Sequence, residues 1–414
     1  MREKIVITGL GCITPIGHNI ESFWEACLKG EKGFGPITHF DGTKVKTSLV
    51  AEVKDFDPTK LLGRKLSRRL DRFSQFAVHA AREAHDHADL TDVESTRIGI
   101  CIGTGVGGVS SFEEEASKME TQGSSYVNPL CMPKWIPNMA AGNIAMDLKI
   151  HGPVHTVSTA CASGIDAIGH AILLLESGRV DAVLAGGAEA CITPTMIAGF
   201  ENMGALSAQS DKNLASIPFD ERRNGFVLGE GAAVLVIETL SSAQRRGANI
   251  LAEIAGYGSS SDAYHLTAPH PEAEGDIRAI NMAMKDADIE PKDVDYINAH
   301  GTATPQNDKT ESKCFKAVFG QELNQVHINS TKSMVGHMQG AAGALETVVC
   351  VQTLLEGKIH PTSGSTQIDP DFGLTIVGQD FIEKKCKYVL NNALGFGGHN
   401  AVLILKSGLV ADSH

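Results

Sequence analysis

Residues 157–172 have the sequence VSTACASGIDAIGHAI, a β-branched run followed by a turn of small residues and then by apolar residues at helical spacing. Cys161 stands at the turn, where a helix N-terminus favours a thiolate and free backbone N–H groups can hold an oxyanion. The segment therefore predicts a nucleophile whose thiol pKa is lowered by the helix. A buried structural cysteine fits the same residues equally well.

Short β-branched runs alternate with helical patterns on both sides of this segment. The strand-like runs are residues 4–8, 98–102, 154–158, 182–185, 233–238, 294–299 and 401–405. Helical spacing of apolar residues is found at 71–88, 165–177, 276–288 and 340–355. This alternation predicts an α/β protein with mixed or parallel sheets.

A weak two-fold pattern divides the chain. A turn rich in small residues opens an Ala-rich helix at 160–164 and again at 340–343. The segment 251–262, LAEIAGYGSSSD, is a candidate boundary between the two parts. We therefore expect two halves, 1–250 and 251–414.

Composition narrows the class of protein. The 414 residues carry a formal net charge of −13, which argues against a general nucleic-acid binder. The nine cysteines form no CxxC pair, and no apolar stretch approaches the roughly 20 residues needed to span a bilayer. The start, MREKIVITGLGCITPIG, is broken by Gly and Pro and is expected to form a strand and turn, not a secretory signal. We expect a cytoplasmic protein with reduced thiols and no membrane insertion.

The stretch GTGVGG at 103–108 fits the pattern G-x-G-x-x-G after a strand-like run. The next acidic residues, 113–115, come too early for a dinucleotide fingerprint. A backbone turn that lines a pocket is therefore the favoured interpretation. With no HExxH or Walker motif in the chain, a metal enzyme or nucleotide binder is not expected.

Two further segments contain groups suited to acid–base chemistry. NAHGTATPQND at 298–308 delivers His300 at the end of a strand-like run, and STKSMVGHMQGAAG at 330–343 holds Lys332 and His337 among small residues. Asp308 and Glu311 are three residues apart, so on a helix they would share a face and could pair with a buried lysine. GFGGHN at 395–400 is expected to form a hairpin turn.

Taken together, these segments resemble the elongating β-ketoacyl-ACP synthases of the condensing-enzyme superfamily. The motifs VITGLGCITPIG, GTGVGG, STACASG, PFDERRNGFVLGEGA, NAHGTATPQND, STKSMVGHMQGAAGALE and GFGGHN occur in the family's order. The resemblance implies a thiolase-like fold, with two pseudo-repeated halves in αβαβα layers, and a homodimer.

The resemblance also implies a reaction in two half-steps. Cys161 takes an acyl group from an acyl-carrier protein, with an oxyanion hole formed by the backbone N–H groups of Cys161 and Phe396. Malonyl-ACP then loses CO2 while His300 and His337 stabilise the enolate, and attack on the acyl-Cys gives a 3-oxoacyl-ACP that elongates a fatty-acid chain. The supporting residues implied are Lys332, Asp308, Glu311 and Glu346.

Substrate contacts follow from the same resemblance. Thr267, Thr302 and Thr304 match residues that bind the phosphopantetheine arm, Val106 and Phe200 match the acyl-pocket wall, and Phe396 matches the gate. No cofactor or metal is required, although some relatives bind a monovalent cation near the residues matching Asn298, Glu346, Asn391 and Asn392.

A basic segment suggests where the carrier protein docks. Carrier proteins of this family are acidic, so an enzyme of net charge −13 needs a local basic patch to attract one. Five basic residues recur at i, i+4 spacing and would form one helix face: Arg64, Lys65, Arg68, Arg69 and Arg72. A solvated helix face without a partner is the alternative.

Four related functions compete with this interpretation. A thiolase would carry a second catalytic cysteine and a starter-type synthase an Asn, so His337 argues against both. A non-catalytic chain-length factor lacks the nucleophile that Cys161 supplies. A polyketide ketosynthase shares the whole Cys-His-His set and stays open.

Overall fold

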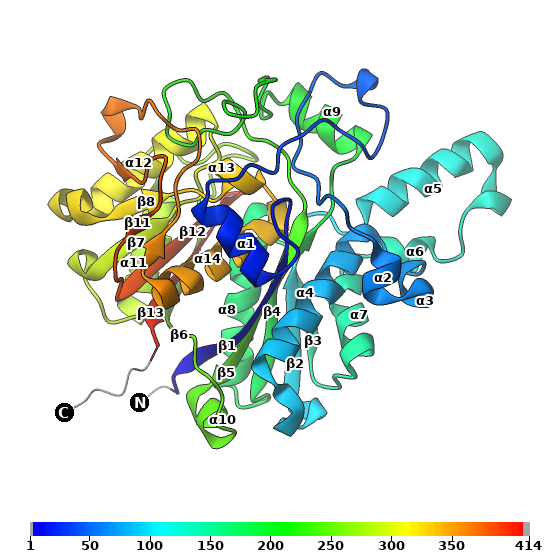
Figure 1. Ribbon diagram of the computed structural model, residues 1–414, viewed down its shortest axis with the longest axis horizontal. Coiled ribbons are helices and arrows are strands. Elements are labelled where there is room, and N and C mark those ends of the chain that lie inside the picture. Colours follow the sequence, from blue (N-terminus) through cyan, green and yellow to red (C-terminus); the bar gives the residue numbers. More distant parts are fainter. Residues whose placement is uncertain (1–2, 409–414) are drawn as a thin grey trace.

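The computed structural model describes residues 3–408 of the chain (Figure 1). One mixed sheet of eleven strands has the order β10-β8-β7-β12-β13-β6-β1-β5-β4-β2-β3, and β9 and β11 form a separate pair. The strands are β1 Ile5–Ile13, β2 Ile98–Gly103, β3 Val154–Val157, β4 Ala182–Glu189, β5 Gly231–Thr239, β6 Ala252–Ser261, β7 Val294–Asn298, β8 His327–Asn329, β9 Lys358–Ile359, β10 Thr375–Ile376, β11 Ile382–Glu383, β12 Tyr388–Gly395 and β13 His399–Ser407.

The large sheet is built from two halves with the same pairing scheme. In the order β3-β2-β4-β5-β1, the first three strands are parallel and the next two pairings are antiparallel. The order β8-β7-β12-β13-β6 repeats this scheme. Among the described strands, the two half-sheets pair with each other through β1 and β6, over three residues. This repetition confirms the predicted pseudo-repeated halves.

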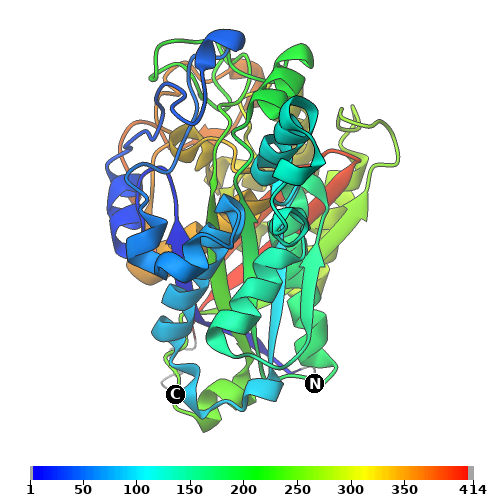
Figure 2. The same cartoon turned by 90° about the vertical axis from the view of Figure 1, so that its right-hand side faces the viewer.

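Helices separate and cover the two half-sheets. They are α1 Ile20–Leu28, α2 Pro58–Leu62, α3 Arg64–Ser67, α4 Arg72–Ala88, α5 Val109–Gln122, α6 Cys131–Trp135, α7 Met139–Leu148, α8 Ser163–Glu176, α9 Pro194–Asn202, α10 Leu240–Arg245, α11 Glu274–Asp286, α12 Pro305–Phe319, α13 Lys332–Val335 and α14 Ala342–Glu356. α8 and α14 lie between the half-sheets, α4 and α7 cover one outer face, and α11 and α12 cover the other (Figures 1 and 2). The predicted αβαβα layering is therefore present.

Glycines on corresponding strands let the outer helices approach closely. A Cβ atom on Gly11 of β1 would lie 2.1 Å from the carbonyl oxygen of Ala80 in α4. In the second half, a Cβ atom on Gly258 of β6 would lie 2.1 Å from the carbonyl oxygen of Ala279 in α11. Any side chain there would push the helix off the sheet, so both halves use the same small-residue contact.

The predicted strands and helices are present, but β1 and β4 extend five and four residues beyond their predicted ends. The candidate boundary segment 251–262 contains the ten-residue strand β6, which pairs with β13 along most of its length and with β1 at its start. Its Gly and Ser residues serve close packing, which a single sequence does not distinguish from a loop. Within residues 3–408, no helix is long and apolar enough to cross a membrane.

Candidate active site

Cys161 lies on the strand–turn–helix junction that its sequence predicts. After β3, residues Ala160–Ala162 form a 3-10 turn, and α8 begins at Ser163. Ala160 has a φ of 51°, a left-handed conformation that costs energy for a residue with a Cβ atom. The Ser163 hydroxyl stabilises the turn, since it accepts from the Thr159 N–H (2.9 Å) and donates to the Ala160 carbonyl (2.6 Å).

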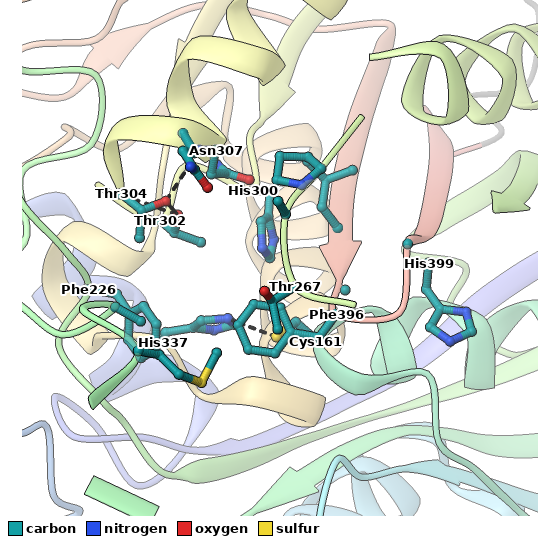
Figure 3. Close-up of a pocket in the computed structure, with 18 of the residues that line it drawn as sticks. Cys161, Phe226, Thr267, His300, Thr302, Thr304, Asn307, His337, Phe396 and His399 are labelled. Carbon is teal, nitrogen blue, oxygen red and sulfur yellow. Dashed lines mark hydrogen bonds between the residues drawn. The ribbon is translucent and has the colours of Figure 1, made fainter. Parts of the chain in front are cut away.

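Two histidines from distant segments meet this cysteine in one cavity of about 370 Å³ (Figure 3). Nε2 of His337, in the turn between α13 and α14, lies 3.0 Å from Sγ of Cys161. His300, just after β7, stands edge-on to the His337 ring with 5.4 Å between ring centroids. The structure thus brings together the Cys-His-His set that the sequence predicts.

The protonation state of the thiol differs from the sequence expectation, and that of the histidines does not. Burial raises the pKa of Cys161 to about 12, and this outweighs the opposing effects of the Lys332 charge and the Phe396 backbone N–H. The prediction of a lowered thiol pKa is therefore wrong for the free enzyme, because the turn removes the sulfur from water. Burial, then the Lys332 charge, holds the pKa values of His300 and His337 well below their usual range, so both imidazoles are neutral.

Gln339 is a site residue that the sequence interpretation missed. The Cys161 thiol donates to its Oε1 (3.3 Å), and its backbone N–H donates to Nδ1 of His337 (3.3 Å). Because Nδ1 accepts this backbone N–H, the proton of the neutral imidazole is on Nε2, which faces the sulfur. Gln339 follows His337 by two residues and stands directly before the predicted helix 340–355. This position in the sequence is the one signal that could have identified it.

Lys332 acts from behind the cavity. Its Nζ donates to Glu346 of α14 (2.5 Å), and both side chains are fully buried. Lys332 does not line the cavity, so it affects the histidines through its charge and not through contact with a substrate.

The expected pairing of Asp308 and Glu311 with a lysine is wrong. Both carboxylates lie on one buried face of α12, as predicted. Glu311 accepts from the backbone N–H groups of His300 (2.7 Å) and Gly301 (2.8 Å). Asp308 accepts from the Phe219 N–H (2.8 Å) and faces the Arg223 guanidinium at 3.7 Å. These carboxylates hold the loop that carries His300, while Glu346 neutralises Lys332.

The predicted substrate-binding residues mostly line the cavity. Thr267, Thr302 and Thr304 line it, and the two hydroxyls of Thr302 and Thr304 lie 2.9 Å apart (Figure 3). Phe200 and Phe396 also line it, whereas Val106 packs in the same apolar cluster without lining the cavity. Phe226, which the sequence interpretation did not include, stands edge-on to His337 at 5.2 Å.

Phe396 occupies the turn of the β12–β13 hairpin, as the glycine-rich sequence predicts. Gly397 and Gly398 have φ values of 87° and 77°, which favour glycine. The turn brings the Phe396 backbone N–H to the Cys161 sulfur, where it lowers the thiol pKa. The loop is thus both a hairpin turn and a wall of the site.

The GTGVGG turn binds a carboxylate of its own chain. Glu189, at the end of β4 and fully buried, accepts from the Thr104 hydroxyl (2.9 Å), the Gly105 N–H (2.6 Å) and the Gly340 N–H (3.0 Å). Residues 103–108 do not line the cavity, so the prediction that this turn lines a pocket is wrong for this site. Glu189 instead ties this turn to the one that carries His337.

The basic segment does not form one helix face. α3 ends at Ser67 and α4 begins at Arg72. The Arg72 guanidinium turns inward, pairs with Glu230 (2.7 Å) and lies 4.6 Å from the Phe76 ring centroid. Four residues stay exposed: Arg64, Lys65, Arg68 and Arg69.

Four residues match the monovalent-cation site that the family resemblance implies, and they share one feature. Each has a buried side-chain oxygen without a hydrogen-bond partner: Asn298 Oδ1, Glu346 Oε2, Asn391 Oδ1 and Asn392 Oδ1. Asn298 and Asn391 are register partners on β7 and β12. Uncharged and anionic oxygens are the ligands that hard cations take, so these residues fit such an ion.

Known proteins share this architecture. The chain is 46% identical over 406 residues to the 3-oxoacyl-[acyl-carrier-protein] synthase 2 of Staphylococcus aureus (strain N315), covering 98% of each chain. Among solved structures, the ishigamide ketosynthase/chain length factor is 36% identical with a TM-score of 0.92, covering 99% of this chain and 100% of that one. A ketosynthase solved with its type II PKS acyl-carrier protein is 33% identical, with a TM-score of 0.91 and the same coverage.

Two family models match most of the chain. "Beta-ketoacyl synthase, N-terminal domain" matches residues 2–243, and "Beta-ketoacyl synthase, C-terminal domain" matches residues 251–366. The nucleophile-bearing turn falls in the first match, and His300 and His337 fall in the second. With its layered fold and its Cys-His-His cavity, the chain belongs to the β-ketoacyl synthase family.

Proposed function

We propose that this chain elongates acyl groups by decarboxylating condensation, joining an acyl-Cys enzyme to malonyl-ACP to give 3-oxoacyl-ACP and CO2. The observation that carries the proposal is the contact of Cys161 Sγ with His337 Nε2, with His300 beside it in one cavity. A thiol nucleophile next to two neutral imidazole groups suits both half-reactions. The 46% identity to a 3-oxoacyl-[acyl-carrier-protein] synthase 2 supports this assignment.

In the first half-reaction, the Cys161 sulfur attacks the thioester of an acyl-carrier protein. The new Sγ–C bond forms, the old C–S bond breaks, and the thiol proton passes to the departing pantetheine sulfur. The backbone N–H of Phe396 already points to the sulfur, which supports its role, with the N–H of Cys161, in the oxyanion hole. The hydroxyls of Thr267, Thr302 and Thr304 are suitable partners for the phosphopantetheine arm.

In the second half-reaction, malonyl-ACP loses CO2 and negative charge develops on its thioester oxygen. The Nε2–H group of His337 can donate to that oxygen once Sγ carries an acyl group, and His300 lies close enough to act with it. Neutral donors stabilise the enolate without protonating its carbon, so the carbanion stays available to attack the acyl-Cys. Lys332 contributes by keeping both histidines uncharged.

No redox or organic cofactor is needed for this chemistry, because both substrates arrive as thioesters. A monovalent cation held by Asn298, Glu346, Asn391 and Asn392 would satisfy four buried oxygens behind the site. Its positive charge would stabilise the Glu346 carboxylate, whose pKa burial raises to about 7.

The acyl-carrier protein docks, in this proposal, on the basic patch formed by Arg64, Lys65, Arg68 and Arg69. All four residues are exposed and none forms a salt bridge within the part of the chain that the structure covers. A chain of net charge −13 repels an acidic partner elsewhere, so such a patch orients the encounter.

In this proposal two copies of the chain form a homodimer through the surface around β3. This strand ends the sheet, so its outer backbone groups can pair with an identical strand (Figure 2). The segment 112–136, which precedes β3 in the chain, exposes large apolar side chains: Phe112, Met119, Tyr126, Leu130, Met132 and Ile136. A homodimer in the cytoplasm fits these features and the nine free thiols. A monomeric mass in light scattering at micromolar concentration would contradict it.

Acylation of Cys161 tests the catalytic proposal. Incubation with acyl-ACP should add one acyl group to the tryptic peptide that contains Cys161, and addition of malonyl-ACP should discharge it with release of CO2. A chain that forms no adduct is not a condensing enzyme. Because one similar solved structure is a ketosynthase in complex with its type II PKS acyl-carrier protein, polyketide elongation is the second candidate. Product analysis with reduced and polyketide acyl-ACPs as primers distinguishes the two.

A further inference from the structure

Gln339 places a side-chain amide against the nucleophile. Its Oε1 accepts from the Cys161 thiol at 3.3 Å, and the residue lines the same cavity as both histidines. Only 9% of its surface is exposed. The amide is therefore one of the groups closest to the first carbons of any acyl chain attached to Cys161.

Hydrogen bonds fix the backbone at Gln339. Gln339 has a φ of 47°, in the left-handed region. Its N–H donates to His337 Nδ1, and the next N–H, of Gly340, donates to the buried carboxylate of Glu189. The main chain of Gln339 is therefore fixed beside His337, and its side chain reaches Cys161 from that position.

The amide has unused hydrogen-bonding capacity. Nε2 of Gln339 is buried and has no partner in the free chain. Acylation makes the Sγ–C bond and transfers the thiol proton to the departing pantetheine sulfur, so Oε1 loses its donor as well. In an acyl-enzyme with this turn unchanged, both ends of the buried amide would lack a partner in the protein.

We propose that Gln339 is a specificity-determining residue that favours acyl groups with a hydroxyl on C3 over fully saturated ones of equal length. The inference rests on the proposed function, since it concerns the acyl group that Cys161 accepts. A 3-hydroxyl can donate to Oε1 and accept from Nε2, whereas a hydrocarbon satisfies neither atom. The nearby walls, formed by Phe200, Phe226 and Phe396, contribute apolar contact that does not distinguish the two.

Single-turnover acylation with matched thioesters tests this inference. Octanoyl- and 3-hydroxyoctanoyl-pantetheine are offered to the full chain, and adduct formation on Cys161 is followed by intact-protein mass spectrometry. The ratio of the two second-order rate constants, hydroxy over saturated, is the readout. Gln339→Leu should lower this ratio about tenfold, or about 1.4 kcal/mol, because leucine cannot pair with the 3-hydroxyl and the advantage of the hydroxylated substrate is lost. A general loss of rate, as a merely structural role predicts, leaves the ratio unchanged.

Gln306→Leu is the matched control, since Gln306 lines the same cavity from α12 and should leave the ratio as in the wild type. Gln339→Met keeps the volume, removes the amide and replaces the Leu variant if that variant does not fold. Equal ratios in the wild type and the Gln339 variant overturn the inference alone. Failure of both thioesters to acylate wild-type Cys161 overturns the proposed function, and the inference with it.

Discussion

The backbone N–H of Gln339 donates to Nδ1 of His337 at 3.3 Å, and this bond decides which imidazole nitrogen carries the proton. The proton on Nε2 faces Cys161 Sγ, 3.0 Å away. His337 in this tautomer is a hydrogen-bond donor to the sulfur and not a base for the thiol. The same N–H group can serve the enolate oxygen after the sulfur is acylated, so one fixed tautomer suits the second half-reaction.

Removal of the nucleophile should separate the two half-reactions. Cys161→Gln should abolish condensation and the acyl adduct, yet retain decarboxylation of malonyl-ACP, because His300 and His337 remain in place. Release of labelled CO2 measures the retained step. Cys131→Ala, at a half-exposed thiol that does not line the cavity, should retain both reactions. Loss of decarboxylation in a folded Cys161→Gln protein would contradict the role of the histidines.

The buried Lys332–Glu346 pair should affect both stability and pH dependence. Lys332→Met leaves the Glu346 carboxylate buried without its partner and should cost about 3 kcal/mol of unfolding free energy. Because the Lys332 charge lowers the pKa of both histidines, its removal should move the acid limb of decarboxylation to higher pH. The double variant Lys332→Met/Glu346→Leu should regain stability but keep the shifted limb. If the acid limb of the pH profile stays at the wild-type pH, the lysine charge does not control the pKa of the histidines.

Two arginines in the basic segment should behave differently. Arg68→Glu should raise the KM for acyl-ACP by about tenfold and leave acylation by free acyl-pantetheine unchanged, because it alters carrier docking alone. Arg72→Gln should lower stability by about 2 kcal/mol, since it leaves buried Glu230 without its cation, with little effect on that KM. Steady-state kinetics and urea unfolding measure the two effects. An unchanged KM in Arg68→Glu would argue against docking on this patch.

Asp276 should make the folded chain less stable as the pH rises from about 4 to about 8. Burial, followed by the Glu311 charge, raises its pKa to about 8, whereas in the unfolded chain it titrates near 3.9. A raised carboxyl pKa contributes stability that is fully present below pH 4 and is lost as the pH rises through 8. Asp276→Asn should therefore gain at least about 1 kcal/mol relative to wild type between pH 6 and pH 9, measured by urea unfolding. Exposed Asp288→Asn should show no such gain, and parallel pH curves for wild type and Asp276→Asn would rule out the shifted carboxyl.

Monovalent cations should stabilise the folded chain. Replacement of K⁺ or Na⁺ by tetramethylammonium at equal ionic strength should lower the Tm of the wild type, because a ligand that binds only the folded state stabilises it. Asn391→Leu removes one of the four unpartnered oxygens and should abolish that difference. A wild-type Tm that does not depend on the cation would exclude a functional site there.

Local features of the chain could be predicted from the sequence. The strand–turn–helix around Cys161 depends on neighbouring residues, since β-branched side chains favour a strand and small residues allow the turn. Asp308 and Glu311 share a buried face of α12 because helical geometry relates residues three apart. The hairpin at Phe396 follows from the glycines beside it. Each of these predictions needed only short-range chemistry, together with the family resemblance that linked the motifs.

The tertiary structure alone decided which partners these residues meet. Lys332 pairs with Glu346 and not with Asp308 or Glu311, because α14 and not α12 presents a carboxylate to its Nζ. Arg72 does not belong to the predicted basic face, because its guanidinium pairs with the buried carboxylate of Glu230.

Protonation likewise depends on the folded molecule. The pKa of Cys161 rises where the helix N-terminus alone predicts a fall, since desolvation is set by all the segments that cover the sulfur. The amide of Gln339 reaches that sulfur across 178 positions of sequence. Burial and long-range contact are properties of packed elements, so periodicity along a single chain determines the elements and their packing determines the chemistry.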